Sequence, residues 1–121
     1  AIINIVNITK ANFDDVTNKD GIVIVDAWAS WCGPRRMFAP VFDKAANNHT
    51  DHVFAKLDTQ NESRLREELG IEHIPTLMVY RDGLLLYKEA GSPPANALEK
   101  IIEQAENLNM DEVRFKQQQA S

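Results

Sequence analysis

Blocks of apolar residues along this chain predict a central sheet. The most apolar block, Ile22–Trp28, is rich in β-branched residues and carries apolar side chains on both faces. Such a block is typical of a central strand that is covered on both sides. Val53–Asp58 predicts a second central strand, and Ile3–Ile8 predicts a shorter strand near the N-terminus. We therefore expect a sheet with helices packed against both of its faces.

Helical spacing governs the segments between these strands. Apolar residues recur at helical intervals from Pro34 to about Asn47, and proline suits a first helical position because it has no N–H to leave unpaired. Pro40 falls inside this helix and should bend it. Shorter helices are predicted for Ala11–Asn18 and for Glu62–Leu69.

Two further strands predict a hairpin. Thr76–Tyr80 and Leu84–Glu89 flank Arg81-Asp82-Gly83, a turn sequence that joins antiparallel strands. The predicted order is β-α-β-α-β-α-β-β-α, in which the early strands need parallel crossovers. The fold class is therefore α/β, with a central mixed β-sheet flanked by helices. Open α/β sheets bind ligands at the carboxyl ends of their strands. Cys32 lies just beyond the end of the strand that finishes near Trp28, so it is a candidate functional residue.

The C-terminal part of the chain changes character near Leu108. A helix opens at Pro94 and presents one apolar face as far as Leu108. The polar, glutamine-rich residues that follow predict a frayed helix or disorder. We therefore expect one domain over residues 1–108 and a polar C-terminal tail over residues 109–121.

Composition and charge exclude several classes of protein. A chain of 121 residues suits one domain, and a net charge of −5 without a basic cluster argues against binding to nucleic acid or to an anionic membrane. No apolar run is long enough to span a bilayer, and the N-terminus lacks the charged region of a signal peptide. A single cysteine excludes an internal disulfide and fits a reducing compartment, so we expect a cytoplasmic protein. We also expect a monomer, although an exposed unpaired thiol could link two chains in air.

Cys32 is the candidate nucleophile. A cysteine at a helix N-terminus faces unpaired backbone N–H groups and the positive end of the helix dipole, which stabilise the thiolate that attacks disulfides. Arg35 and Arg36, in the predicted first turn, act in the same direction if they lie near the sulfur. The alternative is an inert cysteine in the core, which the exposed Trp-Cys-Gly-Pro turn disfavours.

The residues around Cys32 resemble the active-site stretch of the thioredoxin family. This resemblance covers about residues 3–107 and implies a thioredoxin fold. It also implies a protein thiol–disulfide oxidoreductase of cell redox homeostasis, with no cofactor and no metal. The matching residues are Asp26-Ala27-Trp28-Ala29-Ser30-Trp31-Cys32-Gly33-Pro34, Pro40, Ala55-Lys56-Leu57-Asp58, Gly70-Ile71, Ile74-Pro75-Thr76, Arg81-Asp82-Gly83 and Gly91.

The chain departs from the family at Arg35. Thioredoxins carry a second cysteine at this position, three residues after the first, which releases the substrate from the mixed disulfide. Arginine has no electron pair available for that step, so the chain is expected to be limited to attack by Cys32. Release then needs an outside thiol, from glutathione, from thioredoxin reductase or from the substrate protein itself.

The resemblance also assigns roles to residues around the thiol. Asp26 would be a buried proton-transfer carboxylate with Lys56 nearby, and Ile74-Pro75 would be a cis-proline loop facing Cys32, although an ordinary trans proline is the alternative. Arg35 could turn inward to pair with Asp26 or leave its head in water. Trp28 is expected to pack in the core and Trp31 to line an apolar rim. The implied substrate-binding residues are Trp31, Gly33, Pro34, Ile74, Pro75 and Gly91.

The three histidines are the remaining candidates for chemistry. His49 and His52 fall in a polar turn with no cysteine nearby, so we expect solvated side chains and no metal site. His73 precedes Ile74-Pro75 and could act as a base near Cys32, but a surface-loop histidine is the simpler expectation.

Three functions therefore stay open. The first is a thioredoxin-family oxidoreductase that attacks disulfide-containing proteins through one thiol. The second is a redox-inactive binding, adapter or chaperone module that keeps the substrate groove. In the third, Arg35 marks a natural, engineered or erroneous variant of an ordinary dithiol thioredoxin.

Overall fold

A five-stranded mixed sheet lies at the centre of the molecule. The computed structural model describes residues 4–31 and 34–120, and for residues 34–37 and 120 the backbone alone. The strand order is β1-β3-β2-β4-β5, in which β3 pairs in parallel with β1 and β2, and β4 pairs antiparallel with β2 and β5. The strands are β1 Ile5–Ile8, β2 Ile22–Trp28, β3 Val53–Asp58, β4 Thr76–Arg81 and β5 Leu84–Ala90.

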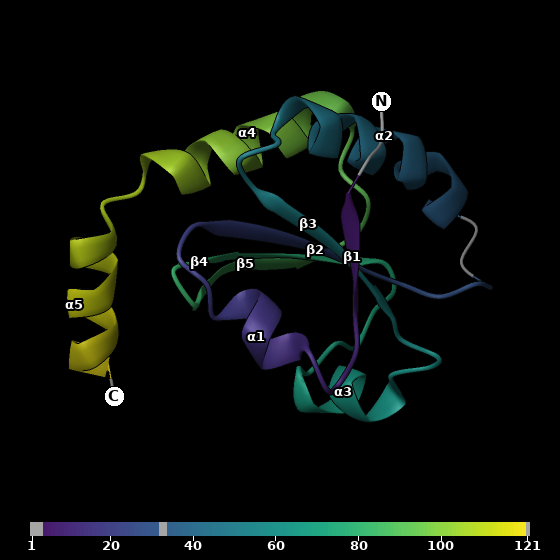
Figure 1. The fold of residues 1–121 in the computed structure, drawn as a ribbon, viewed down its shortest axis with the longest axis horizontal. Coiled ribbons are helices and arrows are strands. Elements are labelled where there is room, and N and C mark those ends of the chain that lie inside the picture. The colour runs from purple at the N-terminus through teal and green to yellow at the C-terminus, as the bar shows by residue number, and fades with distance from the viewer. Residues whose placement is uncertain (1–3, 32–33, 121) are drawn as a thin grey trace.

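Helices cover both faces of this sheet (Figure 1). α2 and α4 lie on one face, and α1 and α3 lie on the other. This three-layer arrangement around a mixed sheet is the one that the resemblance implied, so the predicted fold class is confirmed. The helices are α1 Phe13–Thr17, α2 Pro34–Asn48, α3 Ser63–Glu68, α4 Ala95–Asn107 and α5 Met110–Ala120.

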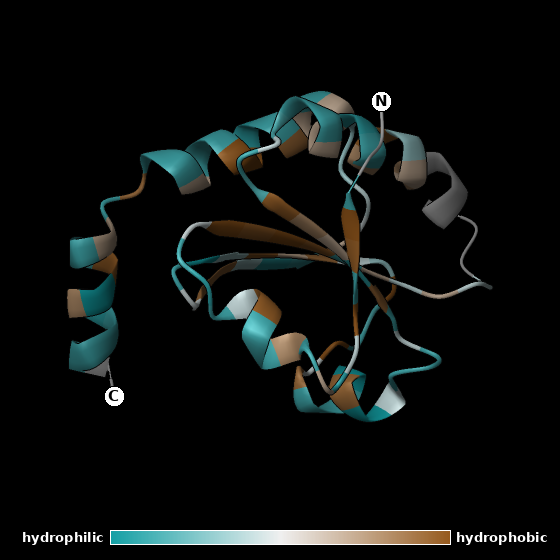
Figure 2. Ribbon diagram, viewed as in Figure 1, coloured by the Kyte–Doolittle hydropathy of each residue, from teal (hydrophilic) through white to brown (hydrophobic). Residues whose placement is uncertain are grey.

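Strand alternation divides the core between the two layers. On β2, Ile22 and Ile24 pack toward α2 and α4, whereas Val23, Val25 and Ala27 pack toward α1 and α3. Because successive side chains of a strand point to opposite faces, a strand covered on both sides must be apolar at nearly every position. Figure 2 accordingly shows the central strands as the most hydrophobic elements. The predicted bounds of β2 and β3 are confirmed.

An aromatic cluster fixes α2 on the sheet. Phe42 is fully buried, and its ring lies 5.7 Å from the Phe38 ring and 5.3 Å from the Phe54 ring. Pro40 lies inside α2 on its exposed side, and the helix continues past it to Asn48. The packing of these rings fixes the orientation of α2 relative to the sheet, and with it the position of the N-terminal end of the helix.

The C-terminal residues form a regular helix, α5, where the sequence predicted a frayed helix or disorder. Leu108 ends α4 in an extended conformation, and the Asn109 side chain then accepts a hydrogen bond from the Glu112 N–H at 3.2 Å, which caps α5. Met110 is buried, and Arg114 reaches Asp82 at 3.3 Å. Figure 1 shows α5 standing apart from the two helical layers. None of the described helices is both long and apolar enough to cross a bilayer.

Candidate active site

Three chain segments meet at one end of the sheet, which we call the Trp28 end. β2 and β3 both finish there, with Trp28 and Asp58 in register. Because β4 runs antiparallel to β2, its first residue, Thr76, lies beside Ala27 at the same end. The connections that follow β2 and precede β4 are therefore neighbours. Cys32 follows this end in the chain, but it lies outside the described residues, so its environment stays a prediction.

Hydrogen bonds hold the segment that leads from β2 toward Cys32. The N–H and the hydroxyl of Thr59 both donate to the Trp28 carbonyl, at 2.9 and 3.0 Å. The Ser30 hydroxyl donates to Oε1 of Gln60 at 2.6 Å. The segment after β3 thus holds the segment after β2 in place as far as Ser30.

The two tryptophans differ in exposure. Trp28 is half-buried, whereas Trp31 is 62% exposed. An exposed indole offers a partner protein an apolar surface whose burial is favourable. The exposure of Trp31 agrees with its expected place on an apolar rim; Gly33 and the side chain of Pro34, expected beside it, lie outside the described residues.

The loop before β4 contains the peptide bond that the resemblance singles out. The Ile74–Pro75 bond is cis. The Pro75 carbonyl accepts a hydrogen bond from the Gly91 N–H at 2.8 Å, and the Thr76 hydroxyl donates to the His73 carbonyl. Gly91 has a φ of 114°, a conformation that residues with a Cβ avoid. The loop is therefore fixed from both sides at the Trp28 end.

Asp26 lies inside the sheet, two residues before that end. It is 4% exposed and shares a face with Ile22 and Ile24, beneath α2. Lys56 is its register partner on β3, as the resemblance implied, and the Lys56 ammonium lies 3.6 Å from a carboxylate oxygen of Asp43 on α2. Sequence reasoning missed Asp43, which nothing in the local pattern sets apart. The Arg35 side chain is not among those described, so both of its predicted placements stay open.

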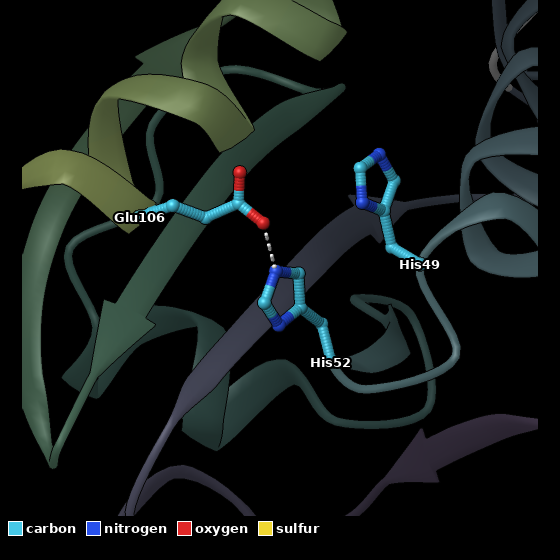
Figure 3. A group of neighbouring side chains, drawn as sticks. All are labelled: His49, His52 and Glu106. Atoms are coloured by element: carbon cyan, nitrogen blue, oxygen red, sulfur yellow. Dashed lines mark hydrogen bonds and ion pairs between the residues drawn. The ribbon is translucent and has the colours of Figure 1, made fainter.

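The prediction of solvated side chains at His49 and His52 was wrong. Their rings stack at 5.7 Å with an angle of 8° between their planes, and their side chains are only 20% and 9% exposed. Each ring meets a carboxylate of α4: His49 lies 2.6 Å from Glu99, and His52 lies 2.8 Å from Glu106 (Figure 3). These contacts shield the two rings against α4, whereas Thr50 and Asp51 between them stay exposed.

His73 differs from the other two histidines. Its side chain is exposed in the loop before Ile74, which agrees with the expectation of a surface-loop histidine. A base role for it near Cys32 stays a prediction.

Comparisons with known proteins point to one family. The thioredoxin family profile matches residues 4–104. A protein of Streptomyces coelicolor classed as a thioredoxin 2 is 44% identical over 109 residues, covering 90% of this chain and 81% of that protein. A thioredoxin of Pseudomonas aeruginosa is 36% identical over 102 residues, covering 83% and 94%. The solved structure of a Malassezia sympodialis thioredoxin superimposes with a TM-score of 0.76 at 31% identity, covering 84% of this chain and 90% of that one.

Proposed function

This chain belongs to the thioredoxin family of redox proteins, and we propose that it is a protein thiol–disulfide oxidoreductase that works through Cys32 alone. The observation that carries the proposal is Arg35, which stands where the family has its second cysteine in a chain that contains only one. The chain can then capture a disulfide but cannot release it by an internal attack.

The proposed reaction is a single exchange. The Cys32 thiolate attacks one sulfur of a substrate disulfide, a new S–S bond joins the two proteins, and the old S–S bond breaks. The other substrate sulfur leaves as a thiolate and takes a proton from water. The proton-transfer role that the resemblance gives Asp26 chiefly serves the second cysteine, so this exchange needs no proton from that buried carboxylate. Lys56 lies beside Asp26 in register on β3.

The Trp28 end supplies features that suit a disulfide-containing protein. Trp31 offers an exposed indole, and the fixed loop at Pro75 offers backbone groups to an extended segment. Ile74 precedes Pro75 in this loop, and the Gly91 N–H donates to the Pro75 carbonyl. Gly33 and Pro34 complete the proposed substrate-binding set. Because the helix α2 begins two residues after Cys32, its free N–H groups would favour the thiolate.

The mixed disulfide must be opened by a thiol that this chain does not provide. We propose glutathione, a thiol of the substrate protein or thioredoxin reductase as the source, in a reducing cytoplasm. The attacking thiolate then takes the bond to one sulfur and leaves Cys32 as a thiolate, ready for another exchange.

Arg35→Cys is the direct test. With insulin as substrate and a thioredoxin reductase with NADPH as the electron source, we expect turnover in Arg35→Cys at least about tenfold above that of the unchanged chain. Arg36→Cys is the matched control, because it adds a cysteine at the wrong spacing and should not gain turnover. Equal turnover in the unchanged chain and Arg35→Cys would contradict the proposed lack of a resolving group.

Adduct formation tests the capture step separately. After incubation with glutathione disulfide, non-reducing mass spectrometry should show one added glutathione per chain, and Cys32→Ser should show none. An unchanged chain that gains no adduct near neutral pH would remove the proposed role of Cys32.

The exposure of Trp31 also favours a second candidate, a binding module without a redox cycle. In that case Cys32→Ser should bind an unfolded client protein as tightly as the unchanged chain, whereas Trp31→Ala should bind it more weakly. If Cys32→Ser abolishes client capture, the oxidoreductase is favoured.

A further inference from the structure

We propose that His49, His52 and Glu106 form a binding site for a divalent transition-metal ion, zinc first, at the end of the sheet opposite the Trp28 end. These three residues come from the turn between α2 and β3 and from the last turn of α4. Among the described residues, they form the group whose potential ligand atoms all lie within 4.8 Å of one another.

The distances suit a zinc ion after small side-chain rotations. Zinc binds imidazole nitrogen and carboxylate oxygen at about 2.0–2.2 Å, so neighbouring ligands of a tetrahedral site lie about 3.4 Å apart. Nε2 of His52 is 2.8 Å from Oε2 of Glu106, so that pair needs to open slightly. His49 needs to move inward, and Figure 3 shows one of its ring nitrogens on the side that faces His52 and Glu106.

Carboxylates near the second nitrogen of each imidazole ring support this assignment. Nε2 of His49 is 2.6 Å from Glu99, which leaves Nδ1 as the nitrogen for a metal. On the other ring, Nδ1 of His52 is 3.8 Å from Asp51, while Nε2 is directed at Glu106. A metal-binding histidine usually has its second nitrogen engaged by a carboxylate or carbonyl, which fixes the tautomer and raises the basicity of the ligand.

Burial and ligand type limit which metal ions can bind at this site. Two imidazoles and one carboxylate are a known zinc set with a fourth position open to water, and imidazole also suits copper and nickel. The rings are mostly shielded, with His52 only 9% exposed, whereas Glu106 is 37% exposed and can adjust. A bound ion would join the turn to α4 by bonds stronger than the present ion pairs.

Isothermal titration of the full chain with zinc chloride tests the site. Cys32 is first alkylated in every sample, so that the thiol cannot bind the ion. We expect one zinc per chain, and at least about tenfold weaker binding in His52→Asn and in Glu106→Gln. Glu99→Gln should weaken binding about tenfold as well, because it frees the His49 ring.

Two matched controls keep the test specific. His73→Asn removes the third histidine of the chain, and Glu103→Gln removes an exposed carboxylate of α4; both should bind zinc within twofold of the unchanged chain. Cobalt(II) should give visible absorption bands with the unchanged chain that Glu106→Gln lacks. The proposal is overturned if the unchanged chain binds no zinc, or if binding persists undiminished in both His52→Asn and Glu106→Gln, with circular dichroism showing that these variants are folded.

Discussion

Asp26 interrupts the aliphatic run of β2 at a position that is 4% exposed. A carboxylate there is unfavourable unless it is paired, hydrogen-bonded or protonated. Sequence alone could identify the residue as unusual, because a charge in a strand that is otherwise apolar on both faces is rare. It could not identify Asp43 on α2 as the residue that meets Lys56, since that contact depends on how the helix lies over the sheet.

Tyr80 makes stability depend on pH in the alkaline range. Burial raises the pKa of Tyr80 above the ordinary 10.0, and its ring packs edge-on against Phe13 at 6.1 Å. The contribution of a group whose folded pKa is raised is complete below the unfolded pKa and is lost as pH rises through the folded one. We therefore expect urea unfolding between about pH 9 and pH 11 to show a shallower loss of stability in Tyr80→Phe.

Tyr87→Phe serves as the comparison. The pKa of Tyr87 is also raised, by burial and by the nearby Glu89, but this residue is more open to water than Tyr80. Its substitution should change the alkaline slope less. An equal or larger change in Tyr87→Phe would show that burial of Tyr80 is not the main cause.

Gly91 is held in a conformation that a Cβ disfavours. Its φ is 114°, and among the described residues none except its chain neighbours has an atom within 4 Å of the place a Cβ would take, so Gly91→Ala should cost about 1–3 kcal/mol through backbone strain alone. Because Gly91 also fixes the Pro75 carbonyl, adduct formation at Cys32 should slow. Gly21→Ala is the control, with a φ of 96°, an equally open site and no contact with that loop. It should lose comparable stability in urea unfolding without slowing adduct formation.

Among the elements, Arg81 joins β4 to the end of α4. Its Nη1 donates to the carbonyls of Ala105 at 2.8 Å, Glu106 at 3.1 Å and Leu108 at 3.1 Å. These carbonyls have no partner within the helix, so a cation there satisfies them and opposes the helix dipole.

We expect Arg81→Met to lower the free energy of unfolding by about 1–3 kcal/mol, as for a lost set of charged hydrogen bonds. Arg64→Met, an exposed change on α3, should cost less than about 0.5 kcal/mol. Guanidinium denaturation of both variants measures the difference. Equal effects would show that Arg81 does not stabilise α4.

The strength of the local signal decided which elements could be predicted. β2 was placed to the residue because its apolar run is typical of a doubly covered strand, and β3 was placed because the mostly apolar Val53–Leu57 lies between polar turns. α5 was missed as a regular helix because its residues are mostly polar; it depends on the Asn109 cap and on a contact between Arg114 and Asp82, 32 residues apart. The shielding of His49 could not be predicted from the local sequence either, since its partner Glu99 is 50 residues away in the chain.

For the whole molecule, we propose that residues 1–108 fold as a unit without α5. The main anchor of α5 is Met110, whose burial contributes about 2 kcal/mol. The ion pair between Arg114 of α5 and Asp82 adds little, because it lies at the surface. A chain ending at Leu108 should unfold cooperatively and be less stable by about 2 kcal/mol. Its Cys32 should react at an unchanged rate, because α5 meets the hairpin turn at the end of β4 that lies away from the Trp28 end.

Met110→Ala in the full chain separates the two contributions. Its stability loss in urea should approach that of the shortened chain. If the shortened chain does not fold, or if Met110→Ala is neutral, α5 contributes in another way and the boundary at residue 108 is wrong.

The antiparallel direction of β4 relative to β2 determines which loops lie at the Trp28 end of the sheet. If β4 ran parallel to β2, the loop at Pro75 would lie at the far end of the sheet from Trp28. The antiparallel pairing of Ala27 with Thr76 instead brings together two segments that are far apart in the chain. The histidine cluster lies at the opposite end, where β3 begins, so a metal there would act on stability without touching the thiol.

The outer strands have a consequence for behaviour at high concentration. β1 has only four residues, and β5 carries Lys88 and Glu89 and pairs with β4 across an irregular register. A short strand, a charged strand and a bulge each make a poor template for a second chain. Crowded molecules of this protein should therefore resist growing into cross-β fibrils, even with Leu85 left open to solvent.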